Sequence, residues 1–341
     1  MDVEKVLVVG ASGRQGFPIC SLLIDSKKFE VFGTSRNAKN VKLHSKGIKV
    51  VPFIYGDENS ITEALRLSQA TLVYFLTDLD IAQNNQRTEV EHGRIIVDAC
   101  KKAGVKFIVY SSIDSADSAP KEARYFRTKV EIESMLKNSG ISFAIIRPPT
   151  FFETFDDGRF FNPLKKRYVK GIFDSSAKIP MVATVDIAKT VVTIFLNREK
   201  WNGKTIHSVS SILTGNDLAA ALTAASGLPC KHAVVMPKLY MRLFLPDLYR
   251  IARYYEEGSK DPAFLAKYQQ YITEFKEIVP DPLTIDEWFE QKGQWANGEK
   301  FGELAPVHSA KENSSSWGLY LTVGVGILAI AYAYYGKRVW I

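Results

Sequence analysis

The chain has 341 residues, 46% hydrophobic and 24% charged, a composition that excludes a wholly disordered or collagen-like protein. Its 44 Lys and Arg against 37 Asp and Glu give a net charge of +7, spread without a dense basic block, so we expect no nucleic-acid partner. Three widely spaced cysteines and five scattered histidines predict neither a disulfide framework nor a metal site.

Apolar segments alternate with helical patterns over the first half of the chain. The expected strands are 6–9, 30–34, 49–54, 71–76, 107–110 and 142–146, and the expected helices are 14–26, 60–67, 89–103 and 128–137. Strands that are mostly apolar along their length belong to a parallel sheet covered on both faces. Two βαβαβ halves fit this order, so we predict an α/β fold with a Rossmann-type, doubly wound parallel sheet.

A glycine-rich loop follows the first expected strand and precedes the first expected helix. It reads Gly10-Ala11-Ser12-Gly13-Arg14-Gln15-Gly16. Gly10 permits a tight turn, Gly13 lets the backbone approach a pyrophosphate at the helix N-terminus, and Gly16 allows close helix–strand packing. We therefore expect a dinucleotide partner, with Gly10, Ser12, Gly13, Arg14, Gln15 and Gly16 as cofactor-binding residues.

The end of the second expected strand indicates which dinucleotide binds. An acidic residue there would hold the ribose 2′-hydroxyl of NAD, but the segment 33–37 reads Gly-Thr-Ser-Arg-Asn. Arg36 can pair with a 2′-phosphate, so we expect NADP(H) in preference to NAD(H). Thr77, at the end of the fourth expected strand, is a further cofactor candidate.

The second half is less regular. A helix is expected at 184–196 and another at 214–225, with short strands at 204–210 and 232–236 and aromatic-rich helices between 238 and 291. We expect an NAD(P)-binding domain over 1–150, to which 180–198 return, and a smaller α/β substrate or partner domain from 151–179 and 199–293. The apolar stretch 236–245 either lines the substrate cleft, lies on a membrane surface or packs into the core.

Residues 317–335 form a run of 19 without a charge, flanked by aromatic residues and followed by Lys337 and Arg338. Such a run is about as long as a bilayer core is thick, so we predict a single transmembrane helix there, after a polar linker at 294–316. The lipid bilayer is then a partner, with the folded part in the cytosol. Basic residues after a short, glycine-containing span favour the mitochondrial outer membrane, with the endoplasmic reticulum as the alternative.

The chain resembles the NmrA-like branch of the atypical short-chain dehydrogenase/reductases over roughly 4–293. The resemblance rests on the glycine loop and on later motifs in order: Gly56-Asp57, Val109-Tyr110-Ser111-Ser112, Ile146-Arg147-Pro148, Phe151-Phe152-Glu153, Pro180-Met181 and Asp186-Ile187-Ala188. It implies one of two functions. Some members are reductases of ketones, quinones or phenolic ethers, and others are regulators or redox sensors that bind NAD(P)(H) and change partners.

The resemblance also implies a catalytic set. Tyr125 and Lys129 fit the Tyr-x-x-x-Lys pattern of short-chain dehydrogenases, in which the Tyr is the general acid and the Lys lowers its pKa and holds the nicotinamide ribose. A spacing of four places both side chains on one helical face. Ser112, with Ser111 as the alternate, would hold the substrate oxygen. Sensor-type members often lack the Tyr, so a Tyr125 that only packs on the surface is the alternative.

We therefore expect an NADP(H)-binding, membrane-anchored protein, an oxidoreductase acting on a hydrophobic carbonyl or quinone-like substrate. The alternative is a non-catalytic NADP(H) sensor, or a regulatory or assembly subunit of a membrane complex with a protein partner. Tyr125 and Lys129 are the residues that separate the two functions.

Overall fold

The structure is a computed structural model that describes residues 3–77, 86–120, 122–156 and 168–291. The predicted linker at 294–316 and the predicted membrane span at 317–335 lie outside these residues. No helix in the described part of the chain combines the length and the hydropathy that a bilayer crossing requires.

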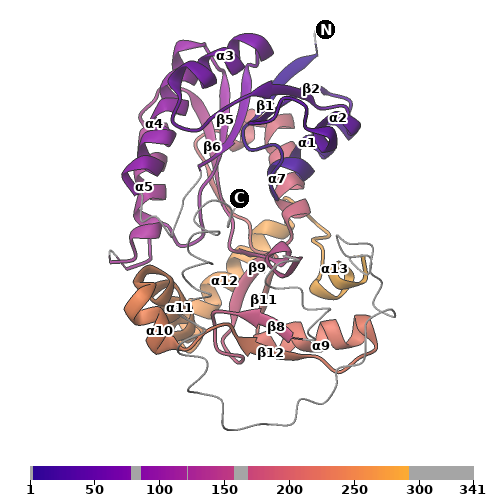
Figure 1. The fold of residues 1–341 in the computed structure, drawn as a ribbon, viewed down its shortest axis with the longest axis vertical. Helices are drawn as coiled ribbons and strands as arrows, with labels where there is room; N and C mark the ends of the chain where they lie inside the picture. Colours follow the sequence, from indigo (N-terminus) through magenta and orange to yellow (C-terminus); the bar gives the residue numbers. More distant parts are fainter. Residues whose placement is uncertain (1–2, 78–85, 121, 157–167, 292–341) are drawn as a thin grey trace.

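A seven-stranded sheet occupies the upper half of the molecule in Figure 1, in the order β10-β6-β5-β4-β1-β2-β3. All neighbouring pairs run parallel. The order of its first six strands along the chain, 3-2-1-4-5-6, is that of the Rossmann fold, so this prediction is confirmed. The strands are β1 (Glu4–Val8), β2 (Phe29–Ser35), β3 (Lys49–Pro52), β4 (Leu72–Leu76), β5 (Phe107–Ser111), β6 (Ser142–Arg147) and β10 (Thr205–His207).

Helices cover both faces of this sheet, as its central strands β4 and β5, buried along their whole length, require. Figure 1 shows α3, α4 and α5 on one side and α1, α2 and α7 on the other. The helices are α1 (Gly16–Asp25), α2 (Val41–Ser45), α3 (Glu58–Ser68), α4 (Gln86–Lys102), α5 (Arg124–Lys137), α7 (Thr184–Leu196) and α8 (Arg198–Trp201).

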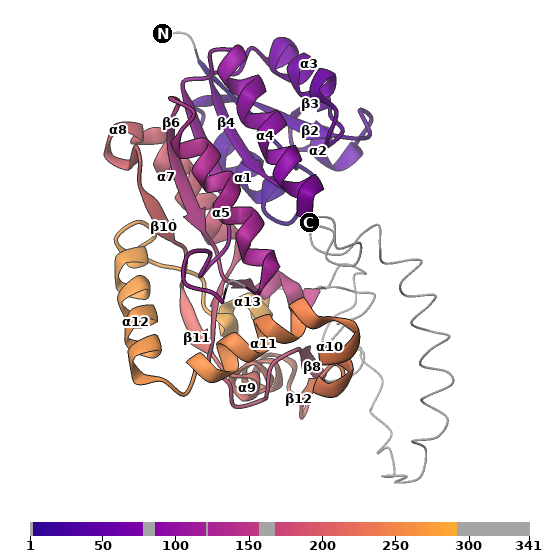
Figure 2. The ribbon, with the colours of Figure 1, turned by 90° about the vertical axis from the view of Figure 1, so that its left-hand side faces the viewer.

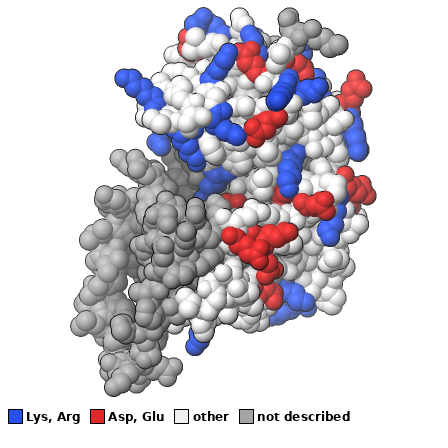
Figure 3. All heavy atoms as spheres, turned by 90° about the vertical axis from the view of Figure 1, so that its right-hand side faces the viewer, with Lys and Arg blue, Asp and Glu red and all other residues white. Residues whose placement is uncertain are grey.

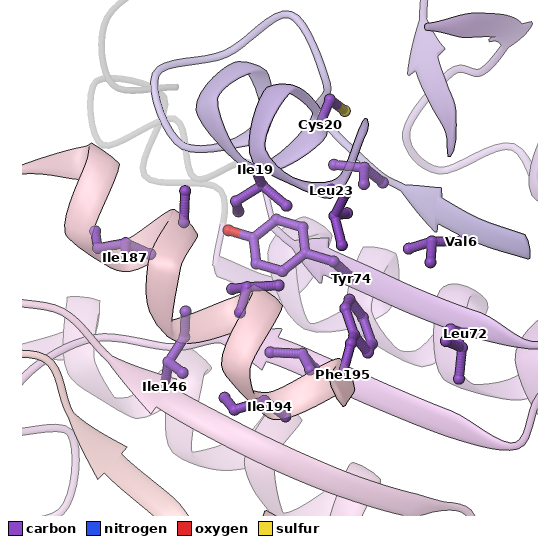
Figure 4. Close-up of a cluster of buried hydrophobic side chains, with 14 of the residues drawn as sticks. Val6, Ile19, Cys20, Leu23, Leu72, Tyr74, Ile146, Ile187, Ile194 and Phe195 are labelled. Carbon is purple, nitrogen blue, oxygen red and sulfur yellow. The ribbon is translucent and has the colours of Figure 1, made fainter. Parts of the chain in front are cut away.

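The contact between α1 and α7 builds one of the two buried clusters beside the sheet (Figure 4). Fully buried side chains from these helices surround Tyr74 of β4: Ile19, Leu23, Ile187, Ile194 and Phe195. Each buried side chain of this size stabilises the fold by roughly 1.5–3 kcal/mol relative to an exposed one. Because α7 comes from beyond residue 180, the face of the sheet next to α1 is closed by a late segment of the chain.

In the described residues the lower lobe contains two small sheets, a 3-10 helix and the α-helices α9 to α13, arranged as Figures 1 and 2 show. Its own buried cluster is rich in aromatic side chains, among them Phe152, Tyr268 and Trp288. The three buried clusters of the described residues lie between Val6 and Phe289. The elements are β7 (Thr150–Phe151), a 3-10 helix at Phe152–Asp156, β8 (Tyr168–Gly171), β9 (Ile179–Val182), β11 (Ser211–Leu213), β12 (Lys231–Val234), α9 (Gly215–Ser226), α10 (Lys238–Phe244), α11 (Pro246–Gly258), α12 (Pro262–Lys276) and α13 (Ile285–Gln291).

A buried carboxylate joins the two halves. Asp114, in the loop after β5, is fully buried, and its Oδ2 accepts hydrogen bonds from the hydroxyls of Tyr255 (2.8 Å), Tyr268 and Ser115 (3.0 Å). Burial and the charge of Asp114 raise the pKa of both tyrosines, so both stay donors. Since α11 and α12 carry these tyrosines, the carboxylate fixes the lower lobe against the carboxyl edge of the sheet.

Two segments beyond residue 180 return to the main sheet. Helix α7 packs on α1, within the range 180–198 expected to return. Residues 205–207, in the range expected for the smaller domain, form β10 and pair with Ile145, Ile146 and Arg147 of β6. A three-residue strand carries too short a pattern to show which sheet edge it joins.

Candidate functional site

The glycine loop between β1 and α1 is as tight as its sequence predicts. Gly10 has a φ of +78°, in the left-handed region, and its carbonyl accepts a hydrogen bond of 2.9 Å from the N–H of Gly13. A Cβ on Gly16 would lie 2.2 Å from the carbonyl oxygen of Gly10, so only glycine fits there. The loop lies at the carboxyl edge of the sheet where β1 borders β4, the switch point at which such sheets bind ligands.

Two side chains brace this loop. Thr34 of β2, which the sequence analysis did not single out, accepts a hydrogen bond of 3.0 Å from the N–H of Gly10. The side-chain oxygen of Gln15 accepts hydrogen bonds from the hydroxyls of Ser111 (2.8 Å) and Tyr74 (3.1 Å). Loop, β2, β4 and β5 are therefore held together at the place expected for the dinucleotide.

The candidates for dinucleotide choice lie at the same edge. Arg36 is exposed and directly follows β2, the parallel neighbour of β1. Arg14 is half-buried and lines the main cavity, whereas Ser12 is exposed in the loop. The exposed guanidinium of Arg36 can take a 2′-phosphate without moving the sheet.

A buried network surrounds the expected ribose lysine. Lys129 lies 2.6 Å from the carboxylate of Glu89 and donates a hydrogen bond of 2.9 Å to the hydroxyl of Thr77. Thr77 donates at 2.7 Å to the same carboxylate oxygen, and Thr128 donates to the other. Lys129 is 6% exposed and Glu89 is fully buried, so this ion pair is internal. Sequence reasoning missed Glu89, because one acidic residue in the first turn of α4 forms no pattern with Lys129 on α5.

Tyr125 precedes Lys129 by one helical turn of α5, and both line the main cavity. Burial raises the pKa of Tyr125, and the negative charge of Glu89 raises it further. The ammonium of Lys129, which was expected to lower this pKa, is neutralised by Glu89. At physiological pH the phenol is therefore protonated, which suits a proton donor and not a base.

Ser111 and Ser112 also line the cavity, but their hydroxyls donate hydrogen bonds to protein side chains and not toward the cavity. Ser112 donates at 2.6 Å to Glu133, whose carboxylate pairs with Arg147 at 2.7 Å. Ser111 donates at 2.8 Å to Gln15. Among the described residues the hydroxyl of Tyr125 has no hydrogen-bond partner. It can therefore donate to a substrate oxygen without breaking an existing hydrogen bond.

The cavity itself extends from the sheet edge into the lower lobe and has a volume of about 240 Å³. Arg14, Gln15 and Thr77 line it on the sheet side. Mainly apolar side chains line it toward the lower lobe, among them Ile113, Phe126, Phe151, Phe155, Phe173 and Leu218. A cavity with one polar and one apolar wall can bring an apolar molecule against the polar groups at the sheet edge.

One imidazole lies in the apolar wall. His232 of β12 lines the cavity, and its Nδ1 lies 2.8 Å from the hydroxyl of Ser175. Burial lowers the pKa of His232, although Asp174 opposes this effect, so the ring is neutral at physiological pH. This imidazole therefore adds a neutral polar group to a mainly apolar wall, which also includes Lys170 and Asp174.

The model of the NmrA-like family matches residues 2–289. Quinone oxidoreductase 2 of Escherichia coli K12 is 28% identical over 228 residues, which cover 65% of this chain and 74% of that protein.

Two solved structures show the same fold. NmrA, a negative transcriptional regulator solved with NADP and also with NAD, has a TM-score of 0.65 in its NADP complex at 18% identity, covering 85% of this chain and 95% of its own. Triphenylmethane reductase of Citrobacter sp., solved with NADP(H), has a TM-score of 0.64 at 17% identity, covering 84% of this chain and 99% of its own.

Proposed function

The chain belongs to the NmrA-like family, and from this premise we propose that it is an NADPH-dependent reductase of a hydrophobic carbonyl or quinone-like substrate. The observation that carries the proposal is the hydroxyl of Tyr125, which lines a largely apolar cavity and is kept protonated by burial and by Glu89. The likeness to a quinone oxidoreductase supports the substrate class.

The dinucleotide fits the sheet edge, because Gly16 leaves no room for a Cβ and Gly10 has a positive φ, so loop and helix start lie close enough to receive a pyrophosphate. The residues that would hold NADPH are the loop 10–16, Arg36 and Thr77. Relatives in structure bind NAD or NADP, which supports a nicotinamide dinucleotide, and Arg36 supports NADP(H).

The chemistry follows from the side chains that line the cavity. When bound, NADPH supplies a hydride. Tyr125 donates a hydrogen bond to the substrate oxygen and then its proton, as negative charge develops there. Phe126 and Phe151 exclude water from the apolar side. The Lys129–Glu89 pair adds no net charge, so it fixes α5 against α4 and keeps the phenol neutral until the substrate oxygen takes the proton.

A second function is a non-catalytic NADP(H) sensor or regulatory subunit. The Lys129–Glu89 ion pair favours this function, because Glu89 already pairs with the lysine that would contact the ribose in a short-chain dehydrogenase. In that case the cavity reports which dinucleotide is bound to a protein partner, and Tyr125 has no chemical role.

We also infer from the sequence that residues 317–335 anchor the protein in a membrane, with the mitochondrial outer membrane as the expected address and the endoplasmic reticulum as the alternative. Nineteen uncharged residues followed by Lys337 and Arg338 support this inference. An anchored reductase would meet lipophilic substrates where they concentrate.

The decisive experiment follows NADPH oxidation against a panel of quinones, aldehydes and ketones. Tyr125→Phe keeps the ring and removes the proton donor, so turnover should fall by about 10²–10⁴-fold with NADPH affinity nearly unchanged. Tyr240→Phe, on α10 and outside the cavity lining, is the matched control. An active wild type that the Tyr125 variant equals in rate removes Tyr125 from the mechanism. A wild type that binds NADPH tightly but reduces no panel member favours the sensor.

A further inference from the structure

Helix α10 exposes large apolar side chains beside the cavity. Leu239, Leu243 and Phe244 are 67%, 65% and 64% exposed, whereas Met241 of the same helix is fully buried. Leu239 and Leu243 are one turn apart, and the ring of Phe244 lies 4.7 Å from that of Tyr240. Soluble surfaces seldom collect such side chains on one short helix unless something covers them.

Basic side chains lie on α10 itself and on the neighbouring helices α11 and α5. Arg242 is exposed on α10 itself, and Arg124, Arg127 and Arg250 line a shallow concavity that also contains Glu122. Asp247 partly offsets two of them, at 3.5 Å from Arg124 and 3.0 Å from Arg250. Lys238 of α10 pairs with Asp174 and Glu256. Among the described residues neither Arg127 nor Arg242 has an ion-pair partner, so these two cations remain available to an anionic surface.

Both groups lie on the same side of the molecule. Figures 1 and 2 show α10, α11 and the lower end of α5 side by side, and α10 packs directly on α11. Figure 3 shows the opposite side, where acidic side chains gather at mid-height and basic ones are spread over the upper half. Apolar and cationic groups therefore meet at one place on the described surface.

This surface borders the cavity wall. Helix α11 follows α10 after one residue, and its Leu248, Ile251 and Tyr255 line the cavity. A molecule that reaches α10 is thus one helix away from the apolar wall. An apolar ligand dissolved in a membrane would approach the cavity from this side.

We propose that α10 and the arginines around it dock on the surface of an anionic lipid bilayer. Leu239, Leu243 and Phe244 insert among the acyl chains, and Arg127 and Arg242 contact anionic headgroups, the arrangement by which short amphipathic elements hold to membranes. The proposal requires neither hydride transfer nor an anchor at 317–335. It adds that the folded part itself contacts lipid and orients its cavity toward it.

The test uses the chain ending at Gln291, which retains all three buried clusters, and vesicles of phosphatidylcholine alone or mixed three to one with phosphatidylserine. We expect it to co-sediment with the mixed vesicles and far less with the neutral ones. Leu239→Ser, Leu243→Ser and Phe244→Ser together should abolish co-sedimentation. The matched control is the triple serine variant of Val41, Leu67 and Leu196, which are exposed apolar residues on other surfaces and should bind as wild type does.

Charge is tested separately. Arg127→Glu with Arg242→Glu should weaken binding to the mixed vesicles at least roughly tenfold, since one basic residue near such a surface is worth about fivefold. Lys101→Glu with Lys106→Glu, on another face, should not. Equal binding to both vesicle types, or none to either, overturns the proposal. The proposal is also overturned if the wild type is a dimer and the triple variant of Leu239, Leu243 and Phe244 is a monomer, because a second copy of the chain would then cover α10. NADPH oxidation with a water-soluble quinone, which α10 variants should leave unchanged, reports on the proposed function independently.

Discussion

Glu89 changes what its neighbours can do. In the short-chain dehydrogenase scheme a lysine lowers the pKa of the tyrosine one turn away, but here a buried carboxylate lies within 2.6 Å of that lysine. Burial and this carboxylate then raise the pKa of Tyr125. The Lys129–Glu89 pair is therefore neutral overall. The tyrosine is suited to reduction, in which it gives a proton, more than to oxidation, in which it takes one.

Breaking this pair should destabilise the protein. Glu89→Gln leaves Lys129 buried without a carboxylate, so the free energy of unfolding should fall by about 3–5 kcal/mol. Glu131→Gln, on the exposed face of α5, should change it by less than about 0.5 kcal/mol. Urea unfolding followed by circular dichroism measures both.

The double variant Glu89→Gln with Lys129→Met completes the cycle. Removing the unpaired charge should recover most of the lost stability, because the cost arises from the leftover cation. A double variant no more stable than Glu89→Gln alone would show that the two residues are not coupled.

Arg36 should decide between the two dinucleotides. Arg36→Asp places a carboxylate where a 2′-phosphate would lie, and the loss of one charge-assisted contact typically costs about 1.5–3 kcal/mol, or roughly tenfold to a hundredfold in affinity. Titration of NADPH and NADH against both proteins measures the preference, with Lys39→Asp as the nearby control. An unchanged preference for NADPH in the Arg36 variant would contradict the assignment.

At the scale of the element, α5 organises the site. Tyr125 and Lys129 line the cavity, and Glu133, one turn further along the same side of the helix, pairs with Arg147 of β6 at 2.7 Å. Ser112 donates to the same carboxylate, so β5, α5 and β6 meet at one buried ion pair. Position along the helix thus determines which residues contact ligand and which fix the helix itself.

The Glu133 pair should be visible in the acid dependence of stability. Burial tends to raise the pKa of Glu133, but hydrogen bonds from Arg147 and Ser112 outweigh it, and the pKa is lowered from 4.5. A carboxyl whose pKa is lower in the folded state stabilises the fold above the unfolded pKa, and this stability is lost as the pH falls through the folded pKa. Glu133→Gln should therefore cost about 3 kcal/mol at neutral pH.

The loss of stability caused by Glu133→Gln should become smaller as the pH falls, because the wild-type carboxyl is then protonated and as neutral as the amide of the variant. Urea unfolding of both proteins at neutral pH and at about pH 3 tests this, with Glu131→Gln as the exposed control. A stability difference that stays constant with pH would mean that the pKa of Glu133 is the same in the folded and the unfolded state, which would contradict the lowered pKa.

The elements with strong local patterns were predictable from the sequence. Apolar strands such as β4 and β5, and the glycine loop with its left-handed Gly10, follow from local periodicity and backbone geometry. The contact of Glu89 with Lys129, and that of Ser112 with Glu133, join residues 40 and 21 positions apart through helix packing. No local sequence pattern encodes these contacts. The sequence therefore predicted Tyr125, Lys129 and Ser112 as site residues, but not the buried carboxylates that Lys129 and Ser112 contact.

At the scale of the whole molecule, tertiary packing decides where the side chains of 236–245 lie. Core packing, cleft lining and a position on a membrane surface were all open. The structure buries Met241 and exposes Leu239 and Leu243, and no residue of this described stretch lines the cavity. Tertiary packing of α10 on α11 selects which side chains face inward, and a short amphipathic segment does not reveal this by itself.

Deleting residues 317–341 should release a protein that still binds dinucleotide, because the cores and the glycine loop lie before residue 292. Full-length and truncated chains, each with a fluorescent tag, are compared by membrane fractionation with a carbonate wash. The full chain should resist the wash and the truncated chain should not. A truncated protein that still resists carbonate would place the anchor elsewhere.

The return of α7 and β10 to the main sheet has a consequence for how the protein is made. Residues 1–150 include the loop and six of the seven strands, yet the apolar face beside α1 stays uncovered until Thr184–Leu196 has left the ribosome. A nascent chain that pauses before that point exposes Tyr74 and its neighbours to water. Such exposed apolar side chains bind chaperones or aggregate. The nucleotide site should therefore form late in synthesis, and a fragment ending near residue 150 should be insoluble although it contains the complete glycine loop.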